Sequence, residues 1–578
     1  MKTIAFYLKP YIGRMLGGLS IKMIGTIMDL FLPWILSKII DDVVPQRDIR
    51  QILLWGGAMV FCAVAAVVTN IIANRMASKV AMLTTKAVRH DLFTKISYLS
   101  CRQVDQFTVS SLESRLTTDT YHVHQMIGMM QRLGIRAPIL LLGGIMITLT
   151  LDPVLTLVLL SVLPFIGGLV YLITKKGIPL YLLLQKGIDA LVRTVRENIT
   201  GIRVIKALSK TEYEKQRFQK VNREVVAREE RAGMTMAFTN PLMNVFLNLG
   251  LTAVILVGAF RVNMGLTQSG KIIAFLTYFT IILNAMLSIT RMFVMYSKGS
   301  AAAGRIGEVL HAEEDMAVRP EDSIDTPYHI IFSHVTFSYH KMQDNLSDIS
   351  FQLKRGDVLG MIGATGCGKS TIAALLMRLY DTDTGEIRIS GQQVNTIPEE
   401  RLHTMFGVTF QNDALFADTI YENIDFGRRL PREQILLAAE CAQAMEFIEA
   451  LPDRFDHMLT QKGTNLSGGQ KQRLLIARAL AGAPEILILD DASSALDYKT
   501  DAKMRRAIAA HYSGTTTIII AQRISSILHA DRILVLDEGR IAGSGTHEEL
   551  LKSCEIYREI SQSQMGGMHD GQDAARNS

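Results

Sequence analysis

The residues most able to do chemistry form a glycine-rich turn in the second half of the chain. Residues 363–371 read GATGCGKST; they follow the apolar run Val358–Ile362 and open the helix-forming stretch Thr371–Tyr380. Glycines let backbone N–H groups turn inward on phosphates, and the start of the following helix adds its positive dipole end. The sequence therefore predicts a loop that cradles nucleotide phosphates, in which Lys369 reaches the β- and γ-phosphates and Ser370 binds Mg²⁺.

Two further segments belong to the same chemistry. Ile486–Asp490 reads ILILD, which indicates a buried strand ending in a carboxylate that associates with Mg²⁺. Leu466–Gln470 reads LSGGQ and stands directly before the helical stretch Lys471–Leu480, so a second glycine turn meets a helix N-terminus. Taken alone, this turn could be a plain helix cap. Two anion-binding surfaces in one domain favour face-to-face dimerisation, with nucleotide between one protomer's loop and the other's turn.

The elements that position these residues form an α/β domain, because short β runs alternate with helical ones from about Ile330 onward. Residues 311–327 are acidic, contain two prolines and are expected to be a linker. The chain from Ser561 is rich in Gly, Gln and Asp, which predicts a disordered tail.

The first half of the chain is apolar. The protein has 578 residues, of which 48% are hydrophobic and 20% charged, as expected for a membrane part joined to a soluble part. Each apolar run is near the ~20 residues that cross the hydrocarbon core as a helix, and a buried soluble core is the weaker reading of so many runs. The runs are 19–40, 52–73, 133–151, 153–174, 242–260 and 272–295.

Lys and Arg gather in the two long connections after the second and fourth runs and near the N-terminus. Basic connections stay in the cytoplasm, so both termini are expected there, and the first run is long enough to be retained as a span. The tips of these connections, 107–116 and 197–206, mix charge with apolar anchors. They are expected to be either exposed elbows or short helices that dock on another domain.

Charge and cysteine content exclude other classes of protein. The net charge of +6 is too small over this length to indicate nucleic acid binding, and the five cysteines have no CxxC spacing. Within the first apolar run, Lys22 and Asp29 lie on one helical face, about 10 Å apart along the axis. They are expected either to line a polar cavity or, for Lys22, to reach the cytoplasmic headgroups. Cys367 is expected to be a small filler facing away from the phosphates, with a redox switch as the alternative.

Six spans followed by these motifs resemble the ATP-binding cassette (ABC) transporter family, specifically half-transporters of the exporter type. The resemblance covers nearly the whole chain. It implies an α-helical membrane domain at 1–310, the linker, an α/β P-loop NTPase cassette at 328–560 and the tail at 561–578. It also implies coupling helices at 107–116 and 197–206, and ATP and Mg²⁺ as cofactors.

The resemblance implies roles for individual residues as well. Tyr339 is expected to stack on adenine, and Gln411 to lie in the Q-loop near Mg²⁺, which Ser370 also binds. The ATP-binding residues implied are Tyr339, Gly363, Ala364, Thr365, Gly366, Cys367, Gly368, Lys369, Ser370, Thr371, Gln411 and Asp490. The signature for a partner's site is Leu466, Ser467, Gly468, Gly469 and Gln470, and the D-loop at the dimer seam is Ser494, Ala495, Leu496 and Asp497.

Two catalytic positions depart from the family pattern. Asp491 stands where the family has the Glu that polarises the attacking water, and Gln522 stands where it has the switch His. The shorter Asp withdraws its carboxylate by roughly 1.5 Å, and misplacement of about 1 Å can cost about 100-fold in rate. The spacer 460–463 before LSGGQ also lacks the acidic residue common in exporters. The pattern is similar to asymmetric heterodimers, in which this chain's own site hydrolyses slowly and its signature completes the partner's site.

The function expected is ATP-driven export of small amphipathic molecules across the bacterial plasma (inner) membrane. The partner is expected to carry the catalytic Glu, the switch His and a degenerate signature. An importer of metal chelates built on the same fold shares every motif and remains an alternative, as does an ATP-gated or regulatory membrane subunit. A soluble ATPase of the same family is excluded by the six apolar runs, and the sequence leaves the transported substrate open.

Overall fold

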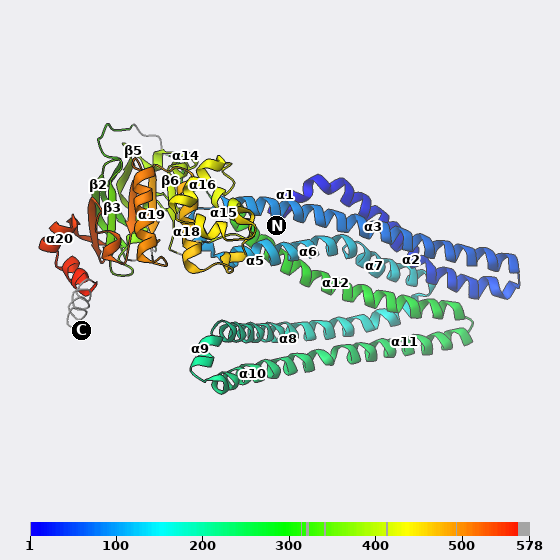
Figure 1. Ribbon diagram of the computed structural model, residues 1–578. Helices are drawn as coiled ribbons and strands as arrows, with labels where there is room; N and C mark the ends of the chain where they lie inside the picture. The colour runs from blue at the N-terminus through cyan, green and yellow to red at the C-terminus, as the bar shows by residue number, and fades with distance from the viewer. Residues whose placement is uncertain are drawn as a thin grey trace. The chain divides into compact units, whose positions relative to one another are not determined.

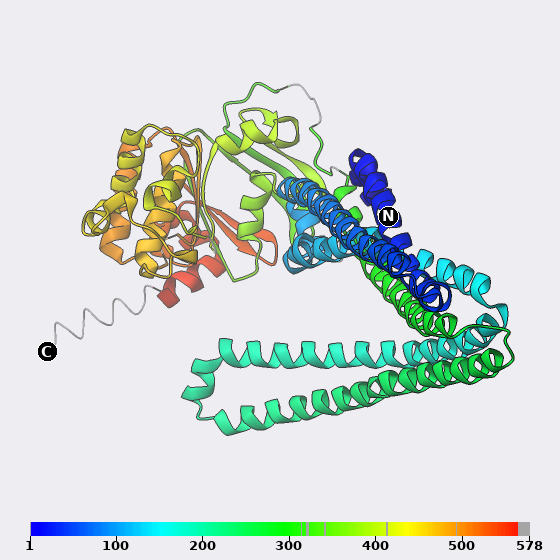
Figure 2. The ribbon, with the colours of Figure 1, turned by 90° about the vertical axis from the view of Figure 1, so that its right-hand side faces the viewer.

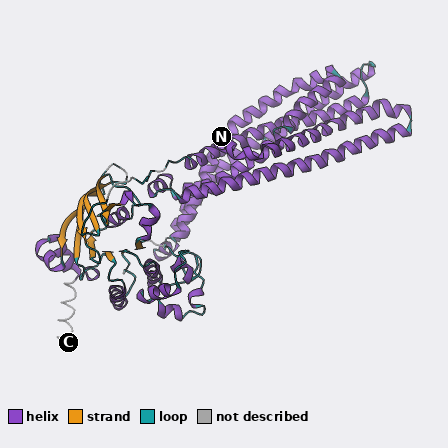
Figure 3. Ribbon diagram, turned by 90° about the horizontal axis from the view of Figure 1, so that it is seen from above, coloured by secondary structure: helices purple, strands orange, loops and turns teal. Residues whose placement is uncertain are grey.

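The computed structural model divides the chain into two compact units. One comprises Met1–Ser97 with Ser110–Ala312, and the other comprises Tyr98–Val109 with Glu313–Ser578. The first unit is helical, and the strands belong to the second (Figure 3). The segment Tyr98–Val109 is an addition to the expected division, because it folds with the second unit. The structure describes residues 2–313, 315–318, 323–339, 341, 343–411, 414–492 and 494–564, so parts of the expected linker lie outside the described residues.

The six apolar runs all fall on helices of the first unit. Five helical stretches are long and apolar enough to cross a membrane, and Pro153–Leu169, at the start of α8, is a shorter apolar helix in the part of the chain that the structure describes. The five are Lys2–Gln46, Ile49–Ser97, Val109–Leu151, Pro241–Asn263 and Ser269–Leu310. The helices are α1 Lys2–Leu8, α2 Ile12–Lys38, α3 Ile49–Ser97, α5 Val109–Ser114, α6 Thr120–Leu133, α7 Arg136–Leu151, α8 Pro153–Thr200, α9 Ile202–Ala207, α10 Thr211–Ala237, α11 Thr239–Asn263 and α12 Ser269–Leu310.

Close packing in this unit depends on small residues that face large ones. A side chain on Gly250 of α11 would collide with the ring of Phe279 on α12, and one on Gly299 of α12 would collide with Met126 of α6. Glycine lets the helix backbones approach to that distance, as is common between membrane helices. The pair α8 and α10 forms a long hairpin with α9 at its tip (Figures 1 and 2).

Arg115 belongs to the packing of this unit, although the sequence places it in the expected tip 107–116. Its guanidinium is buried, donates to the Arg305 carbonyl and pairs with Glu308 at 3.0 Å, both on α12. Arg305 in turn pairs with Asp119. These contacts hold a π-helical turn, Arg115–Asp119, against α12.

The second unit contains two sheets. A four-stranded antiparallel sheet has the order β2-β1-β4-β5, and a six-stranded sheet has the order β10-β9-β3-β8-β7-β6. Parallel pairing joins β9, β3, β8, β7 and β6, so their carboxyl ends share one edge, where ligands of such sheets bind. The strands are β1 Ile330–Phe337, β2 Leu346–Leu353, β3 Val358–Gly363, β4 Thr384–Ile389, β5 Gln392–Gln393, β6 Phe406–Thr409, β7 Ile486–Asp490, β8 Thr516–Ile520, β9 Arg532–Asp537 and β10 Arg540–Gly545.

Helices complete the second unit. They are α13 Lys369–Leu376, α14 Glu399–Thr404, α15 Ile420–Asp425, α16 Arg432–Cys441, α17 Met445–Glu449, α18 Gly468–Ala481, α19 Tyr498–His511 and α20 His547–Ser553. Among them, α13, α14, α18 and α20 contact the six-stranded sheet. Residues 555–564 are also helical, so the expectation of disorder from Ser561 is wrong for 561–564. Ser561 is buried, and Gln564 hydrogen-bonds to the loop after β8, which holds this helix to the domain. Residues 565–578 lie outside the described residues.

The helix that the first tip contributes to the second unit is α4, Cys101–Phe107, and not the predicted segment 107–116. Ser100 and Gln103 form a capping box, which starts the helix. Thr108, with φ of +61°, ends it and separates it from α5. At the second tip, α9 overlaps the predicted segment 197–206.

Candidate active site

The phosphate loop has the strand–loop–helix form that its sequence predicts. It runs from the end of β3 to α13, and Gly363 and Gly368 have φ values of +153° and +99°. A Cβ on Gly363 would stand 2.1 Å from the Leu536 carbonyl oxygen, so only glycine fits there. The Lys369 ammonium donates to the carbonyls of Gly363 at 2.9 Å and Ala364 at 2.8 Å, which keeps its charge inside the loop.

A cavity of about 290 Å³ opens beside this loop at the carboxyl edge of the parallel strands. Most of the residues expected to bind nucleotide line it, and so do Asp491 and Gln522, the two positions expected to act in catalysis. Gly363, Ala364 and Cys367 contribute to the loop without lining the cavity; the thiol of Cys367 is buried against the core, 3.5 Å from the Lys369 ammonium. The lining residues are Tyr339, Asn345, Thr365, Gly366, Gly368, Lys369, Ser370, Thr371, Gln411, Asp490, Asp491, Ile520, Ala521 and Gln522.

The aromatic wall of the cavity is built around Tyr339. Its backbone N–H donates to Asn345 Oδ1 at 3.0 Å, and its hydroxyl donates to Thr371 Oγ1 at 3.3 Å. The ring of Tyr380 meets it edge-on, with centroids 5.0 Å apart. Sequence reasoning missed Asn345 and Tyr380, because no motif connects them to the loop.

Tyr380 links this wall to α4. Its hydroxyl donates to Asp105 Oδ2 at 2.7 Å, and burial, reinforced by Asp105, raises the pKa of Tyr380. The hydroxyl is therefore a proton donor over the physiological pH range. One side chain of the second unit thus contacts both the wall of the cavity and the helix from the first tip.

The oxygen atoms beside the loop suit Mg²⁺. Ser370, Gln411 and Asp490 line one side of the cavity, and hydroxyl, amide and carboxylate oxygens are the hard ligands that this ion prefers. Burial raises the pKa of Asp490, while a hydrogen bond from Ser370 and the charge of Lys369 oppose that rise. When bound, Mg²⁺ neutralises charge that develops on the transferred phosphate.

The two positions expected to act in catalysis, Asp491 and Gln522, contact each other. Gln522 Nε2 donates to Asp491 Oδ2 at 3.1 Å. Asp491 has a left-handed backbone, with φ of +51°, and its N–H donates to the Ile520 carbonyl at 2.9 Å. Burial raises the pKa of Asp491, opposed by a hydrogen bond from Ser494 and by nearby positive charge.

A second contact holds the segment that carries Gln522. The side-chain amide of Gln564 donates to the Gln522 carbonyl and accepts from the Ile524 N–H, both at 2.8 Å. The C-terminal helix therefore fixes the backbone of the switch position. Sequence reasoning missed this residue because it assigned the helix to a disordered tail.

The signature segment lies outside the cavity. Ser467 and Gln470 form a capping box at the start of α18, with Ser467 and Gly468 exposed. A Cβ on Gly469 would lie 3.2 Å from the Ala495 carbonyl, so the D-loop packs beside the signature. Asp497 caps α19 by accepting from the Thr500 N–H. The exposed Ser467 and Gly468 leave the start of this turn open to solvent, while the Ser467 and Gln470 N–H groups are used within the capping box.

A multi-pass helical unit joined to a nucleotide-binding α/β unit defines the class of ATP-driven membrane transporters. The family description "ABC transporter transmembrane region" matches residues 15–286, and "ABC transporter" matches residues 346–494. The uncharacterized ABC transporter ATP-binding protein YfiB of Bacillus subtilis is 36% identical and covers 98% of this chain and 99% of its own. An uncharacterized ABC transporter ATP-binding protein of Mycobacterium tuberculosis is 32% identical, with 96% and 97% covered. The chain belongs to the ABC transporter family.

The fold is that of an exporter half-transporter. The structure of a bacterial Atm1-family ABC exporter with ATP bound matches with a TM-score of 0.80 and 24% identity, and the match covers 96% of this chain and 98% of that one. The predicted fold class, an α-helical membrane domain followed by an α/β P-loop domain, is confirmed. The protein is thus a multi-pass, ATP-hydrolysing transporter subunit that requires a second ABC subunit to form a complete transporter.

Proposed function

We propose that this chain is the slow-site subunit of a heterodimeric exporter in a bacterial plasma (inner) membrane, with both termini in the cytoplasm. The observation that carries the proposal is the hydrogen bond between Gln522 and Asp491. Asp491 has a shorter side chain than the family's Glu, and the amide of Gln522 is less basic than the family's His. The two side chains that would act on the attacking water also bond to each other.

The geometry supports slow hydrolysis at this site. A hydrogen bond from the Asp491 N–H to the Ile520 carbonyl fixes the backbone of Asp491. The backbone therefore cannot move forward to make up for the methylene that Asp lacks relative to Glu. Because the Asp491 carboxylate accepts a hydrogen bond from the Gln522 amide, only its other oxygen is free to accept one from the attacking water. An amide also cannot become the imidazolium that would stabilise developing negative charge.

ATP binding is supported separately from hydrolysis. The phosphate loop, Lys369 and the Tyr339 wall are complete around the cavity. The signature LSGGQ is complete as well, with Ser467 exposed and fixed by its capping box. The chain therefore retains what it needs to hold ATP and to complete a partner's site, and the partner is expected to supply the catalytic Glu and the switch His.

Dimerisation accounts for the exposed tip of the second long hairpin. No residue of α9 is buried, and the apolar side chains of Ile202, Val204 and Leu208 are exposed there. An apolar helix of this kind suits docking on the partner subunit's cassette. The cassette of this chain carries a cavity of about 270 Å³ beside β6, lined in part by Leu379, that suits the partner's corresponding helix. The transported molecules proposed are small and amphipathic.

Two substitutions in the assembled transporter test which site hydrolyses ATP. Ser467→Ala should reduce ATP turnover by at least tenfold, because this serine completes the partner's competent site. Asp491→Asn should reduce turnover less than twofold, because Asp491 serves the slow site. The matched control is Ser553→Ala, a serine whose hydroxyl, among the described residues, bonds to the Glu549 carbonyl of its own helix. The opposite ranking, measured as the steady-state ATPase rate, would place the working centre on this chain and contradict the proposal.

A further inference from the structure

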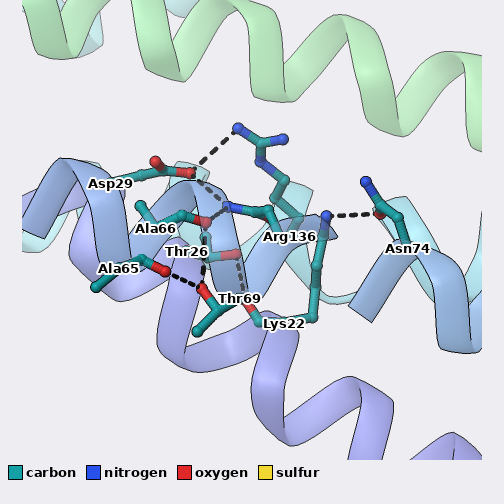
Figure 4. Close-up of polar contacts among 9 residues, drawn as sticks. Lys22, Thr26, Asp29, Ala65, Ala66, Thr69, Asn74 and Arg136 are labelled. Carbon is teal, nitrogen blue, oxygen red and sulfur yellow. Dashed lines mark hydrogen bonds and ion pairs between the residues drawn. The ribbon is translucent and has the colours of Figure 1, made fainter. Parts of the chain in front are cut away.

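A group of charged and amide side chains lies among the apolar helices of the first unit (Figure 4). Lys22 on α2 donates to Asn74 Oδ1 on α3 at 3.0 Å. Arg136 on α7 donates to Asp29 Oδ2 on α2 at 3.2 Å, and Asn70 on α3 lies 3.5 Å from the same oxygen. Lys22 and Asp29 therefore do not pair with each other: Lys22 connects α2 to α3, and Asp29 connects α2 to both α3 and α7.

Burial of Lys22 overturns the expectation that its ammonium reaches the headgroups. The residue is 2% exposed, and its side chain turns to α3. A charge inside a membrane-spanning helix bundle is costly and is kept where it has a function. Packing alone does not account for a lysine here, since a methionine of similar length would fill the space without that cost.

The charges around Lys22 do not balance. Arg132 on α6 and Arg136 are both close enough for their charges to act on the Lys22 ammonium, and Asp29 is the acidic side chain that acts on it. Arg132 has no hydrogen bond or ion pair to any residue that the structure describes. We call Lys22, Arg132 and Arg136 the basic cluster. Like charges in a medium of low dielectric repel strongly, so the basic cluster has an unmet demand for negative charge.

Arg136 and Lys22 also have hydrogen-bond donors that the described residues do not use. Arg136 Nε is buried without a hydrogen-bond partner in the described part of the chain, and the Arg136 side chain as a whole is 39% exposed. Lys22 has three N–H groups, and the structure gives it one partner among the described residues, Asn74. Guanidinium and ammonium groups with free donors are the groups that proteins use to bind carboxylates and phosphates.

We propose that the basic cluster binds an anionic group, a carboxylate or a phosphate, on the transported molecule. This inference rests on the proposed transport function and gives its substrate a charge. Asp29 occupies one side of Arg136, so it competes with the anion for the same donors. An anionic lipid headgroup has the same chemistry as a free anionic amphiphile, and the experiment separates these two sources.

Binding is measured on the complete transporter, without nucleotide, in nanodiscs of phosphatidylcholine. The probes are dodecyl phosphate and dodecyltrimethylammonium, which share a chain and differ in head-group charge. Dodecyl phosphate should bind at least tenfold more tightly, and Lys22→Met and Arg136→Gln should each weaken it by about tenfold or more. The control is Lys176→Met, an exposed lysine on α8 beyond its apolar start.

Asp29→Asn separates a binding role from a structural one. Removing the competing carboxylate should tighten dodecyl phosphate binding several-fold, whereas loss of a purely structural ion pair would weaken it or leave it unchanged. Equal affinity for the two probes, equal loss in the Lys176 control, or no gain in Asp29→Asn would overturn the proposal. If Lys22→Met does not assemble, Lys22→Arg, which keeps the charge, should retain binding.

Anionic lipid in the nanodisc identifies the source of the anion. If phosphatidylglycerol in place of phosphatidylcholine blocks dodecyl phosphate binding in proportion to its content, the basic cluster takes lipid headgroups. If it does not, the free amphiphile is the occupant, which supports the proposal. Competition by the lipid would contradict the assignment of the anion to the transported molecule. Because the measurement uses no ATP, a failed slow-site assignment would leave it unaffected.

Discussion

At the residue scale, the hydrogen bond between Gln522 and Asp491 explains why two substitutions belong together. In the family pattern, a longer carboxylate and an imidazole act on the water and the γ-phosphate. Here an amide donates to a carboxylate that is one methylene shorter, at 3.1 Å. Replacing only one of the two residues is not sufficient. If Asp491 alone became Glu, the Gln522 amide would still donate to the longer carboxylate and occupy one of its oxygens.

The double substitution Asp491→Glu with Gln522→His should therefore raise ATP hydrolysis at this chain's site by at least tenfold. A positioned base and a protonatable partner contribute about 10²–10⁴-fold to such steps. The measurement is the ATPase rate of a transporter in which the partner's site has been inactivated. Each single substitution should give much less than the pair.

Adding Lys369→Ala to the same double variant is the control, because it removes the ammonium inside the phosphate loop. It should abolish the gain. A rate that survives Lys369→Ala would show that the gain comes from elsewhere.

At the scale of elements, α4 reaches the nucleotide cavity through one side chain. Tyr380 contacts Tyr339 with its ring and Asp105 of α4 with its hydroxyl. Ser100 and Gln103 bond to residues 315 and 313, so the start of the helix is held to the second unit as well as Asp105 near its end. Movement of the aromatic wall on nucleotide binding would act directly on α4.

Tyr380→Phe should lower the stimulation of ATPase by transported compounds several-fold and leave ATP affinity within twofold. The ring stays in contact with Tyr339, and the bond to a charged acceptor, worth about 1.5–3 kcal/mol, is lost. Stimulated and unstimulated ATPase rates and equilibrium ATP binding are the measurements.

The control is Tyr421→Phe, a half-buried tyrosine whose hydroxyl has no hydrogen bond within the described residues. If Tyr380→Phe weakened ATP binding as much as stimulation, the hydroxyl would serve the cavity and not α4.

Local patterns were sufficient to predict some elements and not others. The phosphate loop, the strand ending in Asp490 and the helix after LSGGQ are specified by contiguous residues, and the structure places them as expected. The predicted tip 107–116 overlaps α5, whereas the helix that folds with the second unit, α4, begins at the Ser100–Gln103 capping box, which lies before the predicted range. The pairs Tyr380–Asp105, Arg136–Asp29 and Gln564–Gln522 join side chains far apart in sequence, and no periodicity in one sequence reports such pairs.

At the scale of the whole molecule, each long hairpin of the first unit ends in a short helix with a different environment. The first provides α4, which belongs to the chain's own second unit. The second provides α9, none of whose residues is buried. In the proposed dimer, the tip of the first hairpin therefore serves the chain's own cassette and the tip of the second serves the partner's.

Ile202→Asp on α9 should lower substrate-stimulated ATPase and transport several-fold without changing ATP affinity, because α9 contacts the partner and not the nucleotide. Val226→Asp, an equally exposed apolar position on α10, is the control and should have little effect. Equal loss of ATP affinity and transport, or an equal effect of the control, would contradict the assignment of α9 to the partner.

The membership of α4 in the second unit has a consequence for biosynthesis. Asp105 and Tyr380 are 275 residues apart, so at roughly 5–20 residues per second the ribosome needs about 15–55 s to make the second after the first. During that interval α4 has left the ribosome while the sheet that receives it does not yet exist. The cassette must therefore complete its folding around a segment that is already tethered to membrane-inserted helices. A cassette produced alone from residue 313 lacks that segment, and a cassette exchanged between two transporters leaves its own α4 behind.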